Sequence, residues 1–149
     1  MATEKKFGVH FIKYWFDERS GTVYSLSKSP GKSRIVQTHK EANGLIPQEI
    51  HQVVPGEPEF IKSANSRLFL DVHELGKGNI TVEAVAQAHK KDLTVESKHH
   101  VNFLNYWVDE SDGIIFCLSE ANRPLDVIKT HAEAHGFVPQ TVTEVTEGE

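Results

Sequence analysis

The sequence contains one cysteine, Cys117, and no long hydrophobic run. A single cysteine excludes a disulfide within the chain, and such sparing use of cysteine is typical of a reducing compartment. No apolar stretch approaches the roughly 20 residues that span a bilayer, and the first residues, MATEKKFG, contain no apolar signal segment. We therefore expect a cytoplasmic protein without a membrane partner.

A basic surface is missing as well. Residues 1–60 carry 8 Lys or Arg and 7 Asp or Glu, whereas residues 61–149 carry 8 and 14, so the net charge of −5 comes from the second part of the chain. Binding to nucleic acid requires a basic face that neutralises phosphates, so we expect no nucleic-acid partner. The hydrophobic fraction of 38% is that of an ordinary globular domain.

An internal repeat organises the chain. Residues 9–53 align without a gap with residues 101–145, at an offset of 92. The shared sequences are YW at 14–15 and 106–107, DE at 17–18 and 109–110, LS at 26–27 and 118–119, and THxEAxG at 38–44 and 130–136. Identity on this scale between two parts of one chain indicates a duplicated unit.

Each copy has the pattern of two strands, a helix and a third strand. The first two strands, HFIKYWF and TVYSLS in one copy and NFLNYWV and IIFCLS in the other, are rich in aromatic and β-branched residues and flank the turns DERSG and DESDG. A helix follows, closed by Gly44 in the first copy and running from Pro124 to Gly136 in the second. Alternating polarity predicts the last strand at EIHQV, residues 49–53, and at TVTEV, residues 141–145.

Only the second copy has the opening elements, a strand RLFLDVHEL and a helix TVEAVAQAHKKDLTVESKHH with Thr81 as N-cap. Residues 68–149 therefore form a complete β-α-β-β-α-β unit, the ferredoxin-like split arrangement of the α+β class. Residues 1–54 form a partial unit, β-β-α-β, and residues 55–67 form a linker rich in polar residues, Pro and Gly. Either the true start lies upstream, or the partial unit is completed by packing on another surface.

The two units are expected to associate. Sheet-to-sheet packing would make the chain a pseudo-dimeric α+β sandwich or barrel, whereas an uncovered sheet edge would lead to self-association with a second chain.

Six of the nine histidines follow residue 61. His89 continues the apolar stripe of Val82 and Val85, so it is expected to face the core. His73 shares a strand face with Asp71, because the side chains of a strand alternate between its two faces.

His131 and His135 lie at i and i+4 on the second helix, a spacing that directs two imidazoles at one ion. Leu125, Ile128 and Ala132 are expected to mark the buried side of that helix. Taken one at a time, each histidine also fits a buried, hydrogen-bonded core residue, and Cys117 and Glu120 fit structural roles.

The repeat supplies an internal control for these residues. The aromatic pair and the turn glycine recur in both copies, whereas most potential ligands do not. At the offset of 92 the counterparts are Ser25 for Cys117, Lys28 for Glu120, Asn43 for His135 and His39 for His131. A metal site present in the second copy and lost from the first explains this pattern, although drift between the copies would also produce it.

The second copy resembles a known family in four motifs. These are a D-x-H strand end at 71–73, a helical histidine at 89, FCLSEA at 116–121 and HAEAHG at 131–136. They are similar to those of the ferredoxin-like family of nickel-binding proteins catalogued as a domain of unknown function. The resemblance implies a dimeric or pseudo-dimeric α+β sandwich that binds Ni²⁺ or a similar divalent ion, and it implies no established catalysis.

We therefore predict a metal-binding protein. The expected ligands are four histidines, His73, His89, His131 and His135. Asp71, Cys117 and Glu120 are expected as further ligands or as hydrogen-bond partners of the ligating histidines. Imidazole ligands suit Ni²⁺, Zn²⁺ and Cu²⁺, and binding that requires neutral imidazoles should weaken below about pH 6. The alternatives are a small ferredoxin-like enzyme, metal-dependent or monooxygenase-like, and a structural or interaction module without metal.

Overall fold

The computed structural model describes residues 8–42, 47–56 and 67–148. The chain divides into two compact units, one of residues 1–52 with 146–149 and the other of residues 53–145. Helices and antiparallel strands occur in both, which confirms the α+β class. Most of the expected linker, residues 57–66, lies outside the described residues. Within the described ranges, no helix is long and apolar enough to cross a membrane.

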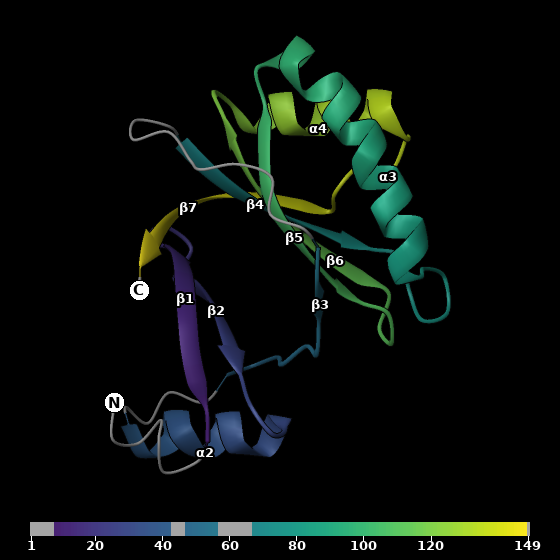
Figure 1. Ribbon diagram of the computed structural model, residues 1–149. Coiled ribbons are helices and arrows are strands. Elements are labelled where there is room, and N and C mark those ends of the chain that lie inside the picture. Colours follow the sequence, from purple (N-terminus) through teal and green to yellow (C-terminus); the bar gives the residue numbers. More distant parts are fainter. Residues whose placement is uncertain (1–7, 43–46, 57–66, 149) are drawn as a thin grey trace. The chain divides into compact units, whose positions relative to one another are not determined.

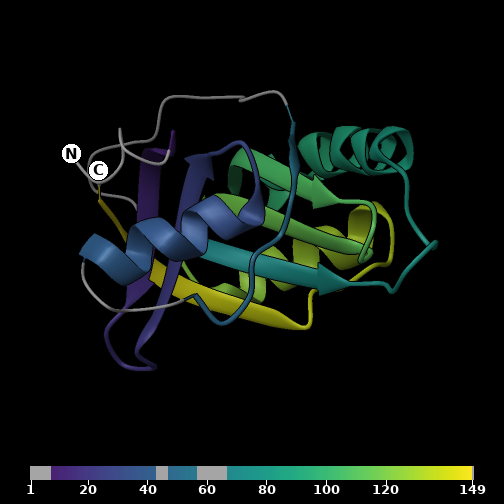
Figure 2. The ribbon, with the colours of Figure 1, turned by 90° about the horizontal axis from the view of Figure 1, so that it is seen from below.

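The larger unit contains a sheet and two long helices. Its elements are β3 (Val54–Pro55), β4 (Arg67–Glu74), α3 (Val82–Val95), the short 3₁₀ helix η1 (Glu96–His99), β5 (Asn102–Asp109), β6 (Ile114–Ala121), α4 (Pro124–Ala134) and the first part of β7 (Thr141–Gly148). Residues 146–148 of β7 belong to the smaller unit. The strands pair antiparallel in the order β7-β4-β6-β5-β3. Figure 2 shows β5, β6, β4 and β7 side by side, and Figure 1 shows α3 and α4 over one face of this sheet.

The face of the sheet under the helices carries both the core and the polar cluster. Phe69 and Phe103 are fully or almost fully buried there and pack with Val127 of α4. Alternation along β4 places Asp71 and His73 on the same face as Phe69. The apolar packing therefore holds ionisable side chains away from water on the same surface.

Local sequence explains where the helices begin and end. Thr81 caps α3, because its hydroxyl accepts a hydrogen bond from the Ala84 amide at 3.0 Å. Pro124 occupies the first position of α4, where the missing N–H costs nothing. Beyond the end of that helix, Gly136 has φ +84°, a conformation that glycine adopts without strain.

The predicted buried side of α4 is wrong for two of its three residues, and the third, Ile128, is half-buried. Leu125 is 46% exposed and Ala132 is exposed, whereas Val127, Thr130 and His131 are buried. The Thr130 hydroxyl donates to the Asp126 carbonyl at 2.7 Å, so a polar residue can occupy the core without an unmade hydrogen bond. The prediction used only the apolar residues of the helix. It therefore placed the buried side on the stripe of residues next to the one that faces the core.

The smaller unit contains β1 (His10–Asp17), β2 (Thr22–Lys28) and α2 (Lys32–Ala42). Strand β1 pairs with β2 and, at its other edge, with residues 146–148 at the end of β7. The strand predicted at 49–53 is wrong, because these residues are not in a strand and only Val54–Pro55 form β3. In the larger unit β7 is held by β4, and the sequence of the partial copy contains no counterpart of β4 to pair with residues 49–53.

Candidate metal centre

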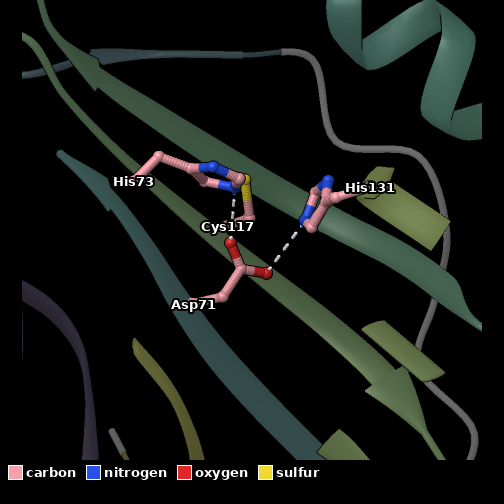
Figure 3. A group of neighbouring side chains, drawn as sticks. All are labelled: Asp71, His73, Cys117 and His131. Carbon is pink, nitrogen blue, oxygen red and sulfur yellow. Dashed lines mark hydrogen bonds and ion pairs between the residues drawn. The ribbon is translucent and has the colours of Figure 1, made fainter. Parts of the chain in front are cut away.

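Four buried side chains meet where β4, β6 and α4 come together (Figure 3). They are Asp71 and His73 of β4, Cys117 of β6 and His131 of α4, and each offers a ligand atom within 4.8 Å of the others. Asp71 and Cys117 are paired across adjacent strands, so the sheet register brings them together. His131 reaches them from the helix above. The sheet therefore places three of the potential ligands and α4 places the fourth.

The Asp71 carboxylate lies between two imidazoles. One oxygen, Oδ1, is 3.0 Å from His73 Nε2, and the other, Oδ2, is 3.2 Å from His131 Nε2. The two rings are nearly perpendicular, with centroids 4.6 Å apart. Both histidines are thus fixed in orientation by one carboxylate that has no exposed surface.

A second group shares His131 with the first. Asp92 Oδ1 of α3 lies 3.0 Å from His131 Nδ1 and 3.0 Å from His135 Nε2, and the two imidazole nitrogens are 3.3 Å apart. His135 follows His131 by one turn and lies at the end of α4. His131 therefore has a carboxylate at each ring nitrogen, Asp71 on one side and Asp92 on the other.

These contacts set the charge of the site. Burial alone would lower the pKa of His131, but its contacts with Asp71 and Asp92 outweigh burial and raise that pKa from 6.5 to about 10. Burial would raise the pKa of Asp71 and of Asp92, yet their contacts with the histidines lower it in both cases. Burial and the two carboxylates raise the pKa of the Cys117 thiol well above its ordinary value. At neutral pH the metal-free centre therefore holds an imidazolium between two carboxylates, beside a neutral thiol.

The donor atoms fit a transition-metal ion. A bond length of about 2.1 Å places neighbouring ligands of an octahedral or tetrahedral ion about 3.0–3.4 Å apart. Asp71 has two such contacts, at 3.0 Å to His73 and 3.2 Å to His131. Within the described part of the chain, His73 Nδ1 is buried and has no hydrogen-bond partner. Imidazole, thiol and carboxylate donors together suit nickel, zinc or copper.

Two residues predicted for the site lie outside both groups. His89 of α3 is buried, and its ring centroid lies 4.4 Å from that of Tyr106. Glu120 follows Cys117 by three positions in β6, which places it on the opposite face of the strand, and it accepts a hydrogen bond from Asn102 Nδ2 at 2.8 Å. The structure thus gathers Asp71, His73, Cys117, His131 and His135, and leaves His89 and Glu120 apart.

Asp92 was missed by sequence reasoning, although a signal was present. It follows His89 by three residues and Val85 by seven, so it lies on the buried stripe of α3. An acidic side chain is almost never fully buried without a partner. An aspartate in register with the apolar stripe was therefore a candidate for a polar cluster.

The model of the family described as nickel responsive protein SCO4226-like matches residues 1–53 and 69–145. The chain belongs to this SCO4226-like family. The second matched segment contains every residue of the two groups around His131.

A solved structure of the SCO4226-like family is similar to this chain. The crystal structure of SCO4226 from Streptomyces coelicolor A3(2) has 38% sequence identity, with a TM-score of 0.49. The match covers 52% of this chain and 93% of that one. The search of curated proteins found no match.

Proposed function

We propose that the chain binds one divalent transition-metal ion of the nickel type at the buried centre around His131. The observation that carries the proposal is the convergence of four buried residues, whose ligand atoms lie within 4.8 Å of one another: Asp71, His73, Cys117 and His131. Membership of a family named for its response to nickel supports nickel as the first ion to test.

Asp71, His73, Cys117 and His131 are the proposed ligands. Asp92 would then act through His131, because a ligating histidine usually donates its second N–H to a carboxylate and Asp92 lies 3.0 Å from His131 Nδ1. His135 contacts the same Asp92 oxygen and stabilises its position. A bound ion supplies the positive charge that two buried carboxylates require, a role that the His131 imidazolium fills in its absence.

Binding must be coupled to proton release. Ligation requires a neutral imidazole and a thiolate, whereas the metal-free centre holds His131 protonated and Cys117 neutral. The affinity for metal should therefore rise with pH through the neutral range. It should continue to rise well above pH 6, because His131 is still protonated there. Among divalent ions, Cu²⁺ is expected to bind more tightly than Ni²⁺ and Zn²⁺ in competition.

The test is a calorimetric titration of chelator-treated protein with Ni²⁺ at pH 7.5. We expect saturable binding that His73→Ala weakens by at least about tenfold, whereas the control His99→Ala leaves it unchanged. His99 lies outside both groups, near Glu133. Absence of uptake, or equal losses in the two variants, would overturn the proposal. Thermal unfolding that responds neither to chelator nor to added metal would instead favour a structural module.

We also propose that the smaller unit is a shortened copy of the larger, ferredoxin-like one, and that the two form a pseudo-dimer within one chain. Local features recur at the 92-residue offset. The Phe11 and His39 rings lie 5.1 Å apart and those of Phe103 and His131 lie 5.0 Å apart. Both β1 and β5 contain a register shift, at Phe11/Lys13 and at Phe103/Asn105. Light scattering should give a monomer of 16.7 kDa, and a larger mass would contradict the pseudo-dimer.

A further inference from the structure

A cavity of about 330 Å³ lies beside the metal centre within the larger unit. This volume falls in the range of sites that bind small organic molecules. A metal ion needs only a small fraction of this space, because its ligands lie about 2 Å from it. Most of the cavity is therefore not accounted for by the proposed ion.

The cavity has a polar end and apolar walls. His73, Cys117 and His131, all buried, line its inner part. Further lining residues, Leu75, Ile80, Val85, Tyr106 and Ile115, belong to one apolar cluster that also contains Cys117. Because Cys117 belongs both to this cluster and to the candidate metal centre, it marks the boundary between the walls and the polar end.

The cavity also opens to the surface. Asn79, Ala84 and Phe137 also line the cavity, and all three are exposed. Phe137 is 54% exposed, a large value for a phenylalanine, and its ring lies 5.7 Å from the His135 ring at 33°. Because His135 also contacts Asp92 and His131, this opening lies beside the polar end of the cavity, and a ligand that enters past Phe137 meets the polar groups there.

The aromatic lining of the cavity and its buried carboxylates determine which class of ligand fits. Tyr106 and His89 line the cavity with their rings 4.4 Å apart, and aromatic surfaces favour a planar aromatic guest. The buried carboxylates of Asp71 and Asp92 disfavour an anionic head group in a region of low dielectric. A neutral hydroxyl can still hydrogen-bond to the imidazoles and carboxylates there.

We propose that this cavity binds a small neutral aromatic molecule with a single hydroxyl, its ring between α3 and strands β5 and β6 and its hydroxyl at the His73–His131 end. This ligand site goes beyond metal binding, and it is tested on metal-free protein. The choice of a phenol-type molecule follows from the combination of aromatic walls, a buried polar end and two carboxylates.

The experiment is an NMR titration of ¹⁵N-labelled, chelator-treated protein with three probes of similar shape: para-cresol, toluene and para-toluate. We expect para-cresol to bind with a Kd below about 1 mM, since burial of one ring supports this affinity. Toluene should bind several-fold more weakly because it makes no hydrogen bond, and para-toluate more than about tenfold more weakly because of its charge. Absence of saturable shifts with para-cresol, or equal binding of para-toluate, would overturn the proposal.

Matched variants on α3 locate the ligand. Ala88 lines the cavity, whereas Ala86, two residues earlier on the same helix and also half-buried, does not. Ala88→Leu should fill the cavity and weaken para-cresol by at least about tenfold, while Ala86→Leu stays within about twofold of the parent. If Ala88→Leu does not fold, Ala84→Leu at the exposed mouth provides the same test. Equal effects at Ala86 and at the lining position would place the ligand elsewhere and overturn the proposal.

The two proposals fail separately. Loss of para-cresol binding with nickel uptake intact removes only the aromatic site. Saturable binding of para-cresol by a protein that takes up no nickel removes only the metal site.

Discussion

Asp71 and Cys117 are paired across the adjacent strands β4 and β6, which places a buried carboxylate beside a buried thiol. Burial, followed by the charge of Asp71 and Asp92, raises the pKa of that thiol well above its ordinary value. A thiol in this position is unreactive unless a cation replaces its proton.

Cys117 is therefore predicted to report directly on metal binding. Chelator-treated protein should resist alkylation by iodoacetamide at pH 8, because the thiolate is scarce and buried. Addition of Ni²⁺ should produce a near-ultraviolet charge-transfer absorption that Cys117→Ser abolishes. Rapid alkylation of the native metal-free protein would contradict the raised pKa of the buried thiol. The same absorption in the serine variant would contradict Cys117 as a ligand.

The stability of the metal-free protein should depend on pH in a defined way. The pKa of His131 is raised from 6.5 to about 10, so its contribution is complete below pH 6.5 and is lost as pH rises through 10. The pKa values of Asp71 and Asp92 are lowered from 3.8, so their contribution is present above that value and is lost as pH falls. Both contributions are complete between about pH 4 and pH 6.5.

The melting temperature of the protein in chelator, measured across pH 3–11, should therefore be highest in that interval. The decline on the alkaline side should disappear in His131→Gln, which has no imidazolium to lose. A metal-free protein whose stability rose steadily from pH 6.5 to pH 10 would contradict the assigned charges.

Asp71→Asn should weaken both the fold and nickel binding. The substitution removes one of the two carboxylates that neutralise His131 in a region without exposed surface, and we expect a loss of about 2–4 kcal/mol in unfolding free energy for the metal-free protein. The matched control is Asp126→Asn. The Asp126 side chain is only 9% exposed, but its partner Arg123, at 2.7 Å, is 61% exposed, so water screens the pair. Its loss should be about 0–1 kcal/mol. Denaturant titrations of both variants decide the point, and similar losses would argue against the buried charge cluster.

Two glycines at equivalent turns should respond differently to alanine. Gly21 and Gly113 have φ of +69° and +70°, and each donates its amide to an aspartate carbonyl at 2.9 Å. A Cβ on Gly21 meets nothing within 4 Å, whereas one on Gly113 would lie 1.9 Å from the carbonyl oxygen of Gly76. Gly21→Ala should cost about 1–2 kcal/mol from the backbone conformation alone, and Gly113→Ala clearly more. Equal melting temperatures of the two variants would contradict this packing.

The elements of the larger unit were predictable because their local signals agree. Alternation along β4, the Thr81 cap and Pro124 at the first position of α4 all point to the observed structure. The prediction failed at residues 49–53, where a strand-like pattern has no partner strand in its own copy. Pairing partners are a tertiary property that an isolated segment does not encode.

The candidate site was predictable where the sequence spacing of two residues determines whether their side chains lie on the same face of a strand or helix. Strand alternation placed Asp71 with His73, and helical spacing placed His131 one turn before His135. The same period would have separated Glu120 from Cys117, since positions three apart in a strand face opposite sides. Asp92 was missed because its role depends on the approach of α3 to α4, which brings it to His131 across 39 residues of chain.

The position of His131 in both acid–histidine groups limits stoichiometry. A neutral imidazole has one lone pair for a metal, so His131 cannot bind one ion in each group at the same time. When Nε2 binds the metal, Nδ1 keeps its proton and donates a hydrogen bond to Asp92. If Nδ1 bound the metal instead, that hydrogen bond would be lost. Saturation is thus expected at one equivalent of ion per chain, with the acidic residue of α3 accepting a hydrogen bond from the ring N–H in both the empty and the loaded state.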